Sequence, residues 1–129
     1  MNKLLDLQQK ADEYLVVNPA ALQILLQMQI NCLRLQQSLL AAANTCGCAK
    51  LGTDKLPLPE NADWKQLKAL PTGDDLTKLC PNCRLELQER LGALLFYAAA
   101  LANTLNFDLT EICDREIDKL DLLGYFMMQ

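Results

Sequence analysis

The chain lacks histidine altogether, and it has few aromatic or β-branched side chains. Aromatic residues make up 5% of its 129 residues, whereas hydrophobic residues make up 51%. Valine and isoleucine, which favour strands, are scarce. The core must therefore be built from leucine and alanine, which are strong helix formers, as are the abundant glutamine, glutamate and lysine. This composition predicts an all-α protein.

An excess of positive charge is also missing. The net charge is −4, whereas a protein that binds nucleic acid polymers presents a basic surface. The local pairs Lys50/Lys55 and Lys65/Lys68 are too sparse to provide one. The sequence also lacks the apolar core of a signal peptide and any run of about 18 uncharged apolar residues. We therefore expect a cytoplasmic protein with neither a nucleic acid polymer nor a membrane among its partners.

The length predicts one domain, residues 1–129, organised as a helical bundle. Leucine and alanine recur at helical spacing in four long segments, which are 1–16, 19–43, 81–106 and 108–123. Asn18 and Pro19 suit the N-cap and first residue of the second helix. Asp108 and Glu111 resemble a capping box before the last helix, which Gly124 is expected to end. The third helix has the fewest polar residues, so we expect it to be the most buried.

The high apolar content bears on assembly as well. One bundle of this size, with 51% hydrophobic residues, is expected to leave a helix face exposed. We therefore expect a homodimer or a higher homo-oligomer.

Four of the six cysteines form two close pairs at the ends of the irregular segment 44–79. One residue separates Cys46 from Cys48, and two separate Cys80 from Cys83. Glycine and proline interrupt the segment, which predicts a long loop. A metal clip at its two ends would explain such a loop inside a small domain. Four thiolates complete a tetrahedral site, and we predict that these four cysteines hold a structural Zn²⁺ without a catalytic role.

The same cysteines leave other interpretations open. Cys80 and Cys83 have the spacing of a redox dithiol, although no predicted strand precedes them as in a thioredoxin-like motif. Four thiolates also suit iron–sulfur, and the thiols could stay unligated. In a reducing compartment disulfides are not expected. Cys32 and Cys113 lie among apolar neighbours in predicted helices, and we expect both to be small hydrophobic residues of the core.

Residues 89–119 carry a pattern of spaced residues that matches a known family, formed by Glu89, Gly92, Leu95, Phe96, Leu101, Ala102, Leu105, Asp108, Glu111 and Lys119. With these positions in register, the segment resembles the second half of the MazG-type all-α nucleotide pyrophosphohydrolase domain. That family carries Glu-Glu-x-Gly-Asp-x-Leu-Phe, Leu-Ala-x-x-Leu, a short turn with Asp, and a last helix that ends near Lys. The resemblance implies a four-helix MazG-like fold and a nucleotide ligand.

The departures from the family bear on its activity. The family hydrolyses the α–β bond of nucleoside triphosphates with Mg²⁺ held by Glu-Glu-x-x-Glu on an earlier helix and Glu-x-x-Asp on the third. The latter positions are Arg90 and Ala93 here, and no acidic residue lies between Glu13 and Asp54. Mg²⁺ needs charged oxygen ligands, which neutral amides and an arginine do not supply. The sequence therefore predicts the fold without the usual metal site.

Other carboxylates are candidates for a rebuilt site. Glu86 and Glu89 lie three residues apart on the third helix, and they are the catalytic candidates. The last helix adds an acidic series at helical spacing, formed by Asp108, Glu111, Asp114, Asp118 and Asp121. Series of this kind are usually solvated helix faces.

Three functions follow. The first is a divergent MazG-like protein with a structural zinc and no catalysis, which binds a nucleotide or a partner. The cations that could meet a phosphate are Arg84, Arg90 and Lys119. The second is an active pyrophosphohydrolase that uses Mg²⁺ with Glu86, Glu89 and the acids of the last helix. The third is a structural adaptor that binds another protein through an apolar helix face.

Overall fold

The computed structural model describes residues 2–15, 20–52, 65 and 74–127. Four α-helices and one π-helical turn form the described part of the chain, in agreement with the predicted all-α class. They are α1 (Lys3–Tyr14), α2 (Ala21–Ala41), the turn η1 (Ala42–Cys46), α4 (Pro81–Thr104) and α5 (Leu109–Met127).

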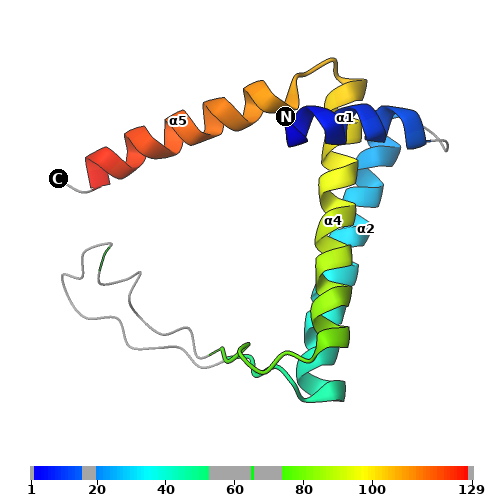
Figure 1. The fold of residues 1–129 in the computed structure, drawn as a ribbon, viewed down its shortest axis with the longest axis vertical. Coiled ribbons are helices and arrows are strands. Elements are labelled where there is room, and N and C mark those ends of the chain that lie inside the picture. The colour runs from blue at the N-terminus through cyan, green and yellow to red at the C-terminus, as the bar shows by residue number, and fades with distance from the viewer. Residues whose placement is uncertain (1, 16–19, 53–64, 66–73, 128–129) are drawn as a thin grey trace.

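Helices α2 and α4 run side by side in opposite directions and form the body of the molecule (Figure 1). The residues that α2 buries most deeply, Ile24, Asn31 and Ser38, are spaced seven apart. That spacing keeps them on one face of the helix. Asn31 satisfies its buried amide by donating to the Gln27 carbonyl oxygen at 2.7 Å. The seven-residue repeat therefore explains why α2 lies along its neighbour over its full length.

Helix α1 crosses the pair at the end where α2 begins and α4 ends (Figure 1). The core is concentrated at this crossing, where Ala11, Ile24, Ala99 and Ala100 are almost completely buried. Alanine has only a methyl group, so three helix backbones can approach closely here. Larger apolar side chains surround the alanines, namely Leu7, Leu15, Phe96, Tyr97, Leu101 and Leu109.

A polar network at the same end joins α1 to the start of α5. Gln8 is 7% exposed, and its Nε2 donates to Asn103 Oδ1 at 3.0 Å and to the Phe107 carbonyl oxygen at 2.9 Å. Its Oε1 accepts the Leu109 backbone N–H at 2.9 Å. Asn103 Nδ2 donates in return to the Gln8 carbonyl oxygen at 2.8 Å. Because these buried polar atoms are paired, the network fixes where α5 begins.

The turn between α4 and α5 follows the sequence prediction in part. Asn106 adopts a left-handed conformation with φ 59°, which asparagine tolerates better than most residues. The Phe107 N–H donates back to the Ala102 carbonyl oxygen at 2.8 Å and closes the end of α4. Asp108 caps α5 by accepting the Thr110 N–H at 2.9 Å. Glu111, the expected capping-box partner, instead pairs with Arg115 at 3.2 Å.

Two predicted helix ends require comment. Gly124 was expected to end the last helix, and this prediction is wrong, because α5 continues to Met127. A glycine ends a helix only when it adopts the left-handed conformation. In α5 it keeps the helical one, at a cost of about 1 kcal/mol relative to alanine. Helix α2 begins at Ala21 with Ala20 as its N-cap, while Asn18 and Pro19 lie outside the described residues.

Burial also departs from expectation. In α4, predicted to be the most buried helix, Leu85, Leu91 and Leu95 are each more than half exposed. Cys32 is exposed and is therefore not a core residue, whereas Cys113 is half-buried. Periodicity shows that a helix has an apolar face, but it does not show that the same chain covers it. None of the helices within the described residues combines the length and the apolar character that crossing a membrane requires.

Candidate metal centre

The first cysteine pair lies just beyond the end of α2. The helix widens into η1, whose last residue is Cys46. Gly47 then turns the chain with φ 80°, a conformation that glycine adopts without steric cost. The Ala49 N–H donates to the Ala42 carbonyl oxygen at 3.2 Å and folds the segment back over the turn. The Cys-Gly-Cys sequence therefore lies in a tight bend, in which Cys46 is exposed and Cys48 is half-buried.

The second pair lies at the start of α4. Cys80 is the N-cap, and its Sγ accepts the Cys83 backbone N–H at 3.4 Å. Pro81 occupies the first helical position, where its missing N–H costs nothing. Because the first N–H groups of a helix point toward its cap, they favour negative charge on Cys80. The second cysteine pair therefore lies at the boundary between the loop and α4.

A short backbone ladder holds the two arms of the loop together. The Lys50 N–H donates to the Asp75 carbonyl oxygen at 2.8 Å, and the Asp75 N–H donates to the Lys50 carbonyl oxygen at 2.6 Å. Next to this bridge, the Gly52 N–H donates to Asp74 Oδ1 at 2.7 Å. These bonds bring the chain after Cys48 close to the chain before Cys80. They thereby position the two pairs independently of any metal.

The four sulfur atoms gather at one point. The Sγ atoms of Cys46, Cys48, Cys80 and Cys83 all lie within 4.8 Å of one another. Cys46 Sγ and Cys80 Sγ are 3.8 Å apart. A regular tetrahedron with Zn–S bonds near 2.3 Å has S···S edges of about 3.8 Å. The thiols are too far apart for a disulfide, and the donor set and its spacing fit one tetrahedral ion.

The pKa values of Cys46, Cys80 and Cys83 are shifted in different directions. The backbone N–H of Cys83, together with its thiol, lowers the pKa of Cys80 to about 7 from an ordinary value of 9.0. The hydrogen bond with Cys80 raises the pKa of Cys83, and that with Cys48 raises the pKa of Cys46. The Cys80 thiolate therefore forms readily, while Cys46 and Cys83 hold their protons. A bound divalent ion would remove this difference in protonation between the thiols, because thiols that coordinate a metal ion are deprotonated.

The remaining site candidates do not join this cluster. Among the residues that the structure describes, the four cysteines are the one group of Cys, Asp and Glu side chains close enough together to hold an ion. Glu86 and Glu89 lie on α4, and Asp114, Asp118 and Asp121 lie exposed on α5. Of the predicted cations, Arg84 is exposed on α4, and Lys119 lies 3.7 Å from Glu116 within α5.

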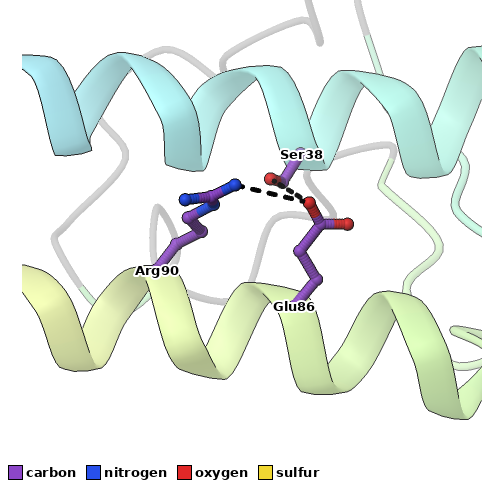
Figure 2. Close-up of polar contacts among 3 residues, drawn as sticks. All are labelled: Ser38, Glu86 and Arg90. Carbon is purple, nitrogen blue, oxygen red and sulfur yellow. Dashed lines mark hydrogen bonds and ion pairs between the residues drawn. The ribbon is translucent and has the colours of Figure 1, made fainter.

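A polar concavity lies between the second half of α2 and the first half of α4. Its volume is about 220 Å³, and it is lined by Arg34, Gln37, Ser38, Ala41, Glu86 and Arg90. Figure 2 shows Ser38 on α2 facing Glu86 and Arg90 on α4. Ser38 Oγ donates to Glu86 Oε1 at 3.2 Å, and Arg90 Nη2 lies 3.8 Å from the same oxygen. Arg90 Nε is buried without a hydrogen-bond partner within the described structure.

Sequence reasoning found Glu86 and Arg90 but missed Arg34 and Ser38 in this concavity. The signal was the seven-residue repeat of α2, which places Ser38 on the buried face and Arg34 beside it. Comparison with known protein families, with curated proteins and with solved structures finds no match. The two sites therefore have to be interpreted from their own geometry.

Proposed function

We propose that Cys46, Cys48, Cys80 and Cys83 hold one structural Zn²⁺ that closes the loop between α2 and α4. The observation that supports this most directly is the gathering of four sulfur atoms within 4.8 Å of one another, on two separately ordered turns. With four protein ligands the ion has no open coordination position, so it stabilises the fold and does not catalyse a reaction. Thiolate ligands of this kind suit a reducing compartment, and we place the protein in the cytoplasm.

The test is the metal content of the purified protein, measured by elemental analysis, for the wild type and two variants. Cys83→Ser removes one ligand, and Cys113→Ser removes a thiol of α5 outside the cluster. We expect close to one zinc per chain for the wild type and Cys113→Ser, and much less for Cys83→Ser. Cys83→Ser should also lose stability on the order of 3 kcal/mol, the closure cost of a loop of this length. Equal melting temperatures and no bound metal in all three proteins would refute the proposal.

We further propose that the chain is a divergent MazG-like protein without pyrophosphohydrolase activity. The four-helix arrangement and the in-register residues of α4 and α5 support this relationship. Arg90 and Ala93 stand where the family has its Glu-x-x-Asp, and Arg90 lies beside Glu86 in the concavity between α2 and α4. A site with one carboxylate and two guanidinium groups suits an anion better than Mg²⁺.

The ligand that fits this concavity is the phosphate portion of a nucleotide. Its volume of about 220 Å³ is below the range of pockets that enclose a whole drug-sized ligand, so only part of a nucleotide would be held. Titration of the protein with a nucleoside triphosphate and with inorganic pyrophosphate, followed by calorimetry, tests the idea. We expect Arg90→Gln to weaken binding of both at least tenfold, with Arg84→Gln as the control on the same helix.

Catalysis is the alternative, and it has its own test. An active enzyme would release pyrophosphate from nucleoside triphosphates only with Mg²⁺, and would lose that release in Glu86→Gln or Glu89→Gln. We expect no turnover, because these two carboxylates and the acids of α5 form no shared cluster within the described residues. Mg²⁺-dependent turnover abolished by either substitution would replace our proposal with the catalytic one.

A further inference from the structure

The concavity between α2 and α4 has two chemically different ends. Each helix contributes a pair of polar side chains one turn apart, which are Arg34 and Ser38 on α2 and Glu86 and Arg90 on α4. Ser38 faces Glu86 across the pair (Figure 2). Because the two helices run in opposite directions, the turn that carries Arg34 lies beside the turn that carries Arg90. Two cations therefore line one end of the concavity, and a carboxylate with a hydroxyl group lines the other.

The two arginines have unused capacity for hydrogen bonding. A guanidinium group offers five N–H donors in a planar fork. Within the described part of the chain, Arg34 has no hydrogen bond or ion pair, and Arg90 has only its ion pair with Glu86 at 3.8 Å. The Nε of Arg90 is buried without a partner among these residues. The oxygen atoms of an anion would satisfy these donors and balance the charge of both arginines.

Glu86 places a further requirement on such an anion. Its Oε1 accepts the Ser38 hydroxyl at 3.2 Å, which holds the carboxylate beside the concavity. Its Oε2 has no partner within the described residues (Figure 2). An ionised carboxylate accepts hydrogen bonds and donates none. An anion without a hydrogen atom is therefore repelled by Glu86, whereas an anion with a hydroxyl group can donate a hydrogen bond to it.

Phosphate and sulfate differ in this property. Both are tetrahedral anions of four oxygen atoms, so shape alone hardly separates them. Inorganic phosphate keeps at least one hydroxyl group near neutral pH, and a phosphate monoester keeps one at or below its second pKa of about 6. Sulfate keeps none. A site with guanidinium donors at one end and a carboxylate acceptor at the other therefore matches a phosphate group that carries a hydrogen atom.

We propose that Glu86 makes the concavity selective for phosphate groups that carry a hydrogen atom and excludes fully ionised anions such as sulfate. This inference rests on the phosphate site proposed above and narrows its ligand to inorganic phosphate or the protonated terminal phosphate of a nucleotide. The phosphate oxygens accept hydrogen bonds from Arg34 and Arg90, and the phosphate hydroxyl donates to Glu86. The carboxylate thus costs affinity for anions in general and restores it for one class of anion.

The test is calorimetric titration of the zinc-loaded full chain with inorganic phosphate and with sulfate, at a pH of about 6 and constant ionic strength. We expect the wild type to bind phosphate at least about tenfold more tightly than sulfate, the effect of one hydrogen bond to a charged group. Glu86→Gln replaces the carboxylate by an amide of the same shape, which both donates and accepts. This variant should bind sulfate more tightly than the wild type does and lose most of the preference for phosphate.

The matched control is Glu13→Gln on α1. It removes the carboxylate of another ion pair within one helix, in which Lys10 Nζ and Glu13 Oε2 are 3.9 Å apart. The net charge of the protein changes by the same amount, but the concavity keeps its lining residues. Glu13→Gln should therefore prefer phosphate over sulfate as the wild type does.

A third ligand distinguishes the two sources of the phosphate group. A nucleoside monophosphate, titrated under the same conditions, should bind more tightly than inorganic phosphate if the site holds the end of a nucleotide. It should bind more weakly if the site holds free phosphate. In either case we expect its binding to exceed that of sulfate and to weaken in Arg90→Gln.

The outcomes separate this proposal from the one on which it rests. Equal affinity of the wild type for phosphate and sulfate, with both weakened in Arg90→Gln, would overturn the selectivity and leave the anion site standing. A preference for phosphate that persists in Glu86→Gln would also overturn it, because another group would then be responsible. If the wild type binds neither ion, the phosphate site itself is refuted, and the selectivity with it.

Discussion

At the scale of single residues, Asp75 illustrates how the arm before Cys80 is ordered. Its Oδ1 accepts the Thr77 hydroxyl at 2.6 Å and the Thr77 backbone N–H at 3.2 Å. The Thr77 hydroxyl, and after it the backbone N–H, holds the pKa of the Asp75 carboxyl below its ordinary value of 3.8. Thr77→Val removes the hydroxyl and keeps the backbone bond. We therefore expect the pKa of Asp75 to rise part of the way back, measured by NMR titration of its carboxyl carbon.

The sign of the pH effect follows from the same shift. A carboxyl whose pKa is lower in the folded state stabilises the fold above its unfolded pKa. That contribution is lost as the pH falls through the folded pKa. Thr77→Val should therefore reduce the loss of stability that Asp75 causes at low pH. Thr77→Ser keeps the hydroxyl, so Asp75 should titrate there as in the wild type. An Asp75 titration that is the same in all three proteins would contradict the role assigned to the hydroxyl.

At the scale of helices, the junction of α1, α4 and α5 depends on Gln8. Replacing it in Gln8→Leu removes the partners of Asn103 Oδ1, the Phe107 carbonyl oxygen and the Leu109 N–H. Unpaired buried polar groups cost about 1–3 kcal/mol. We expect a loss of this size in the free energy of unfolding, measured with urea, and faster amide exchange in the first turn of α5.

The neighbouring residue provides the matched control. Gln9 is exposed, so Gln9→Leu makes the same chemical change outside the network and should shift stability by about 0.5 kcal/mol or less. If both substitutions had equal effects, the buried network would have no special role. Both proteins have to be compared at one concentration, because association with a second copy would raise apparent stability.

The helices themselves were predictable because local signals specify them. Asp108 caps α5, Pro81 begins α4, and Cys80 caps α4, as residue types and spacings indicate. The predicted end of α5 at Gly124 was wrong, because a glycine ends a helix only if the residues after it leave the helical conformation. The exposure of Cys32 and of the leucines on α4 depends on which helix covers which face. Sequence periodicity does not contain that information.

The gathering of the four cysteines was also predictable from the sequence, but the hydrogen bonds that support it were not. Two cysteine pairs at the ends of one loop identify the four residues that come together. The bridge between Lys50 and Asp75, which brings the pairs together, leaves no pattern in the sequence, because backbone hydrogen bonds are indifferent to side-chain type. The same holds for the concavity that Arg34 and Arg90 both line, which depends on the register between α2 and α4.

At the scale of the whole molecule, different interactions stabilise the two ends of the α2–α4 pair. The alanine-rich core with Ile24 closes one end, and the cysteine cluster closes the other. Ile24 and Cys46 are separated by 22 residues of nearly continuous helix, or about 30 Å at 1.5 Å per residue. No side chain contacts both ends, so the two fastenings should stabilise the fold independently.

A double-mutant cycle measures that independence. Ile24→Val removes one methyl group from the core at a cost of about 0.5–1.5 kcal/mol, and Cys83→Ser opens the cluster at the opposite end. Changes that are far apart usually add within about 0.5 kcal/mol. We expect the double variant to show this sum in urea unfolding, at fixed zinc and protein concentrations. A coupling energy above about 1 kcal/mol would mean that the packing interface between α2 and α4 transmits strain from one end of the pair to the other.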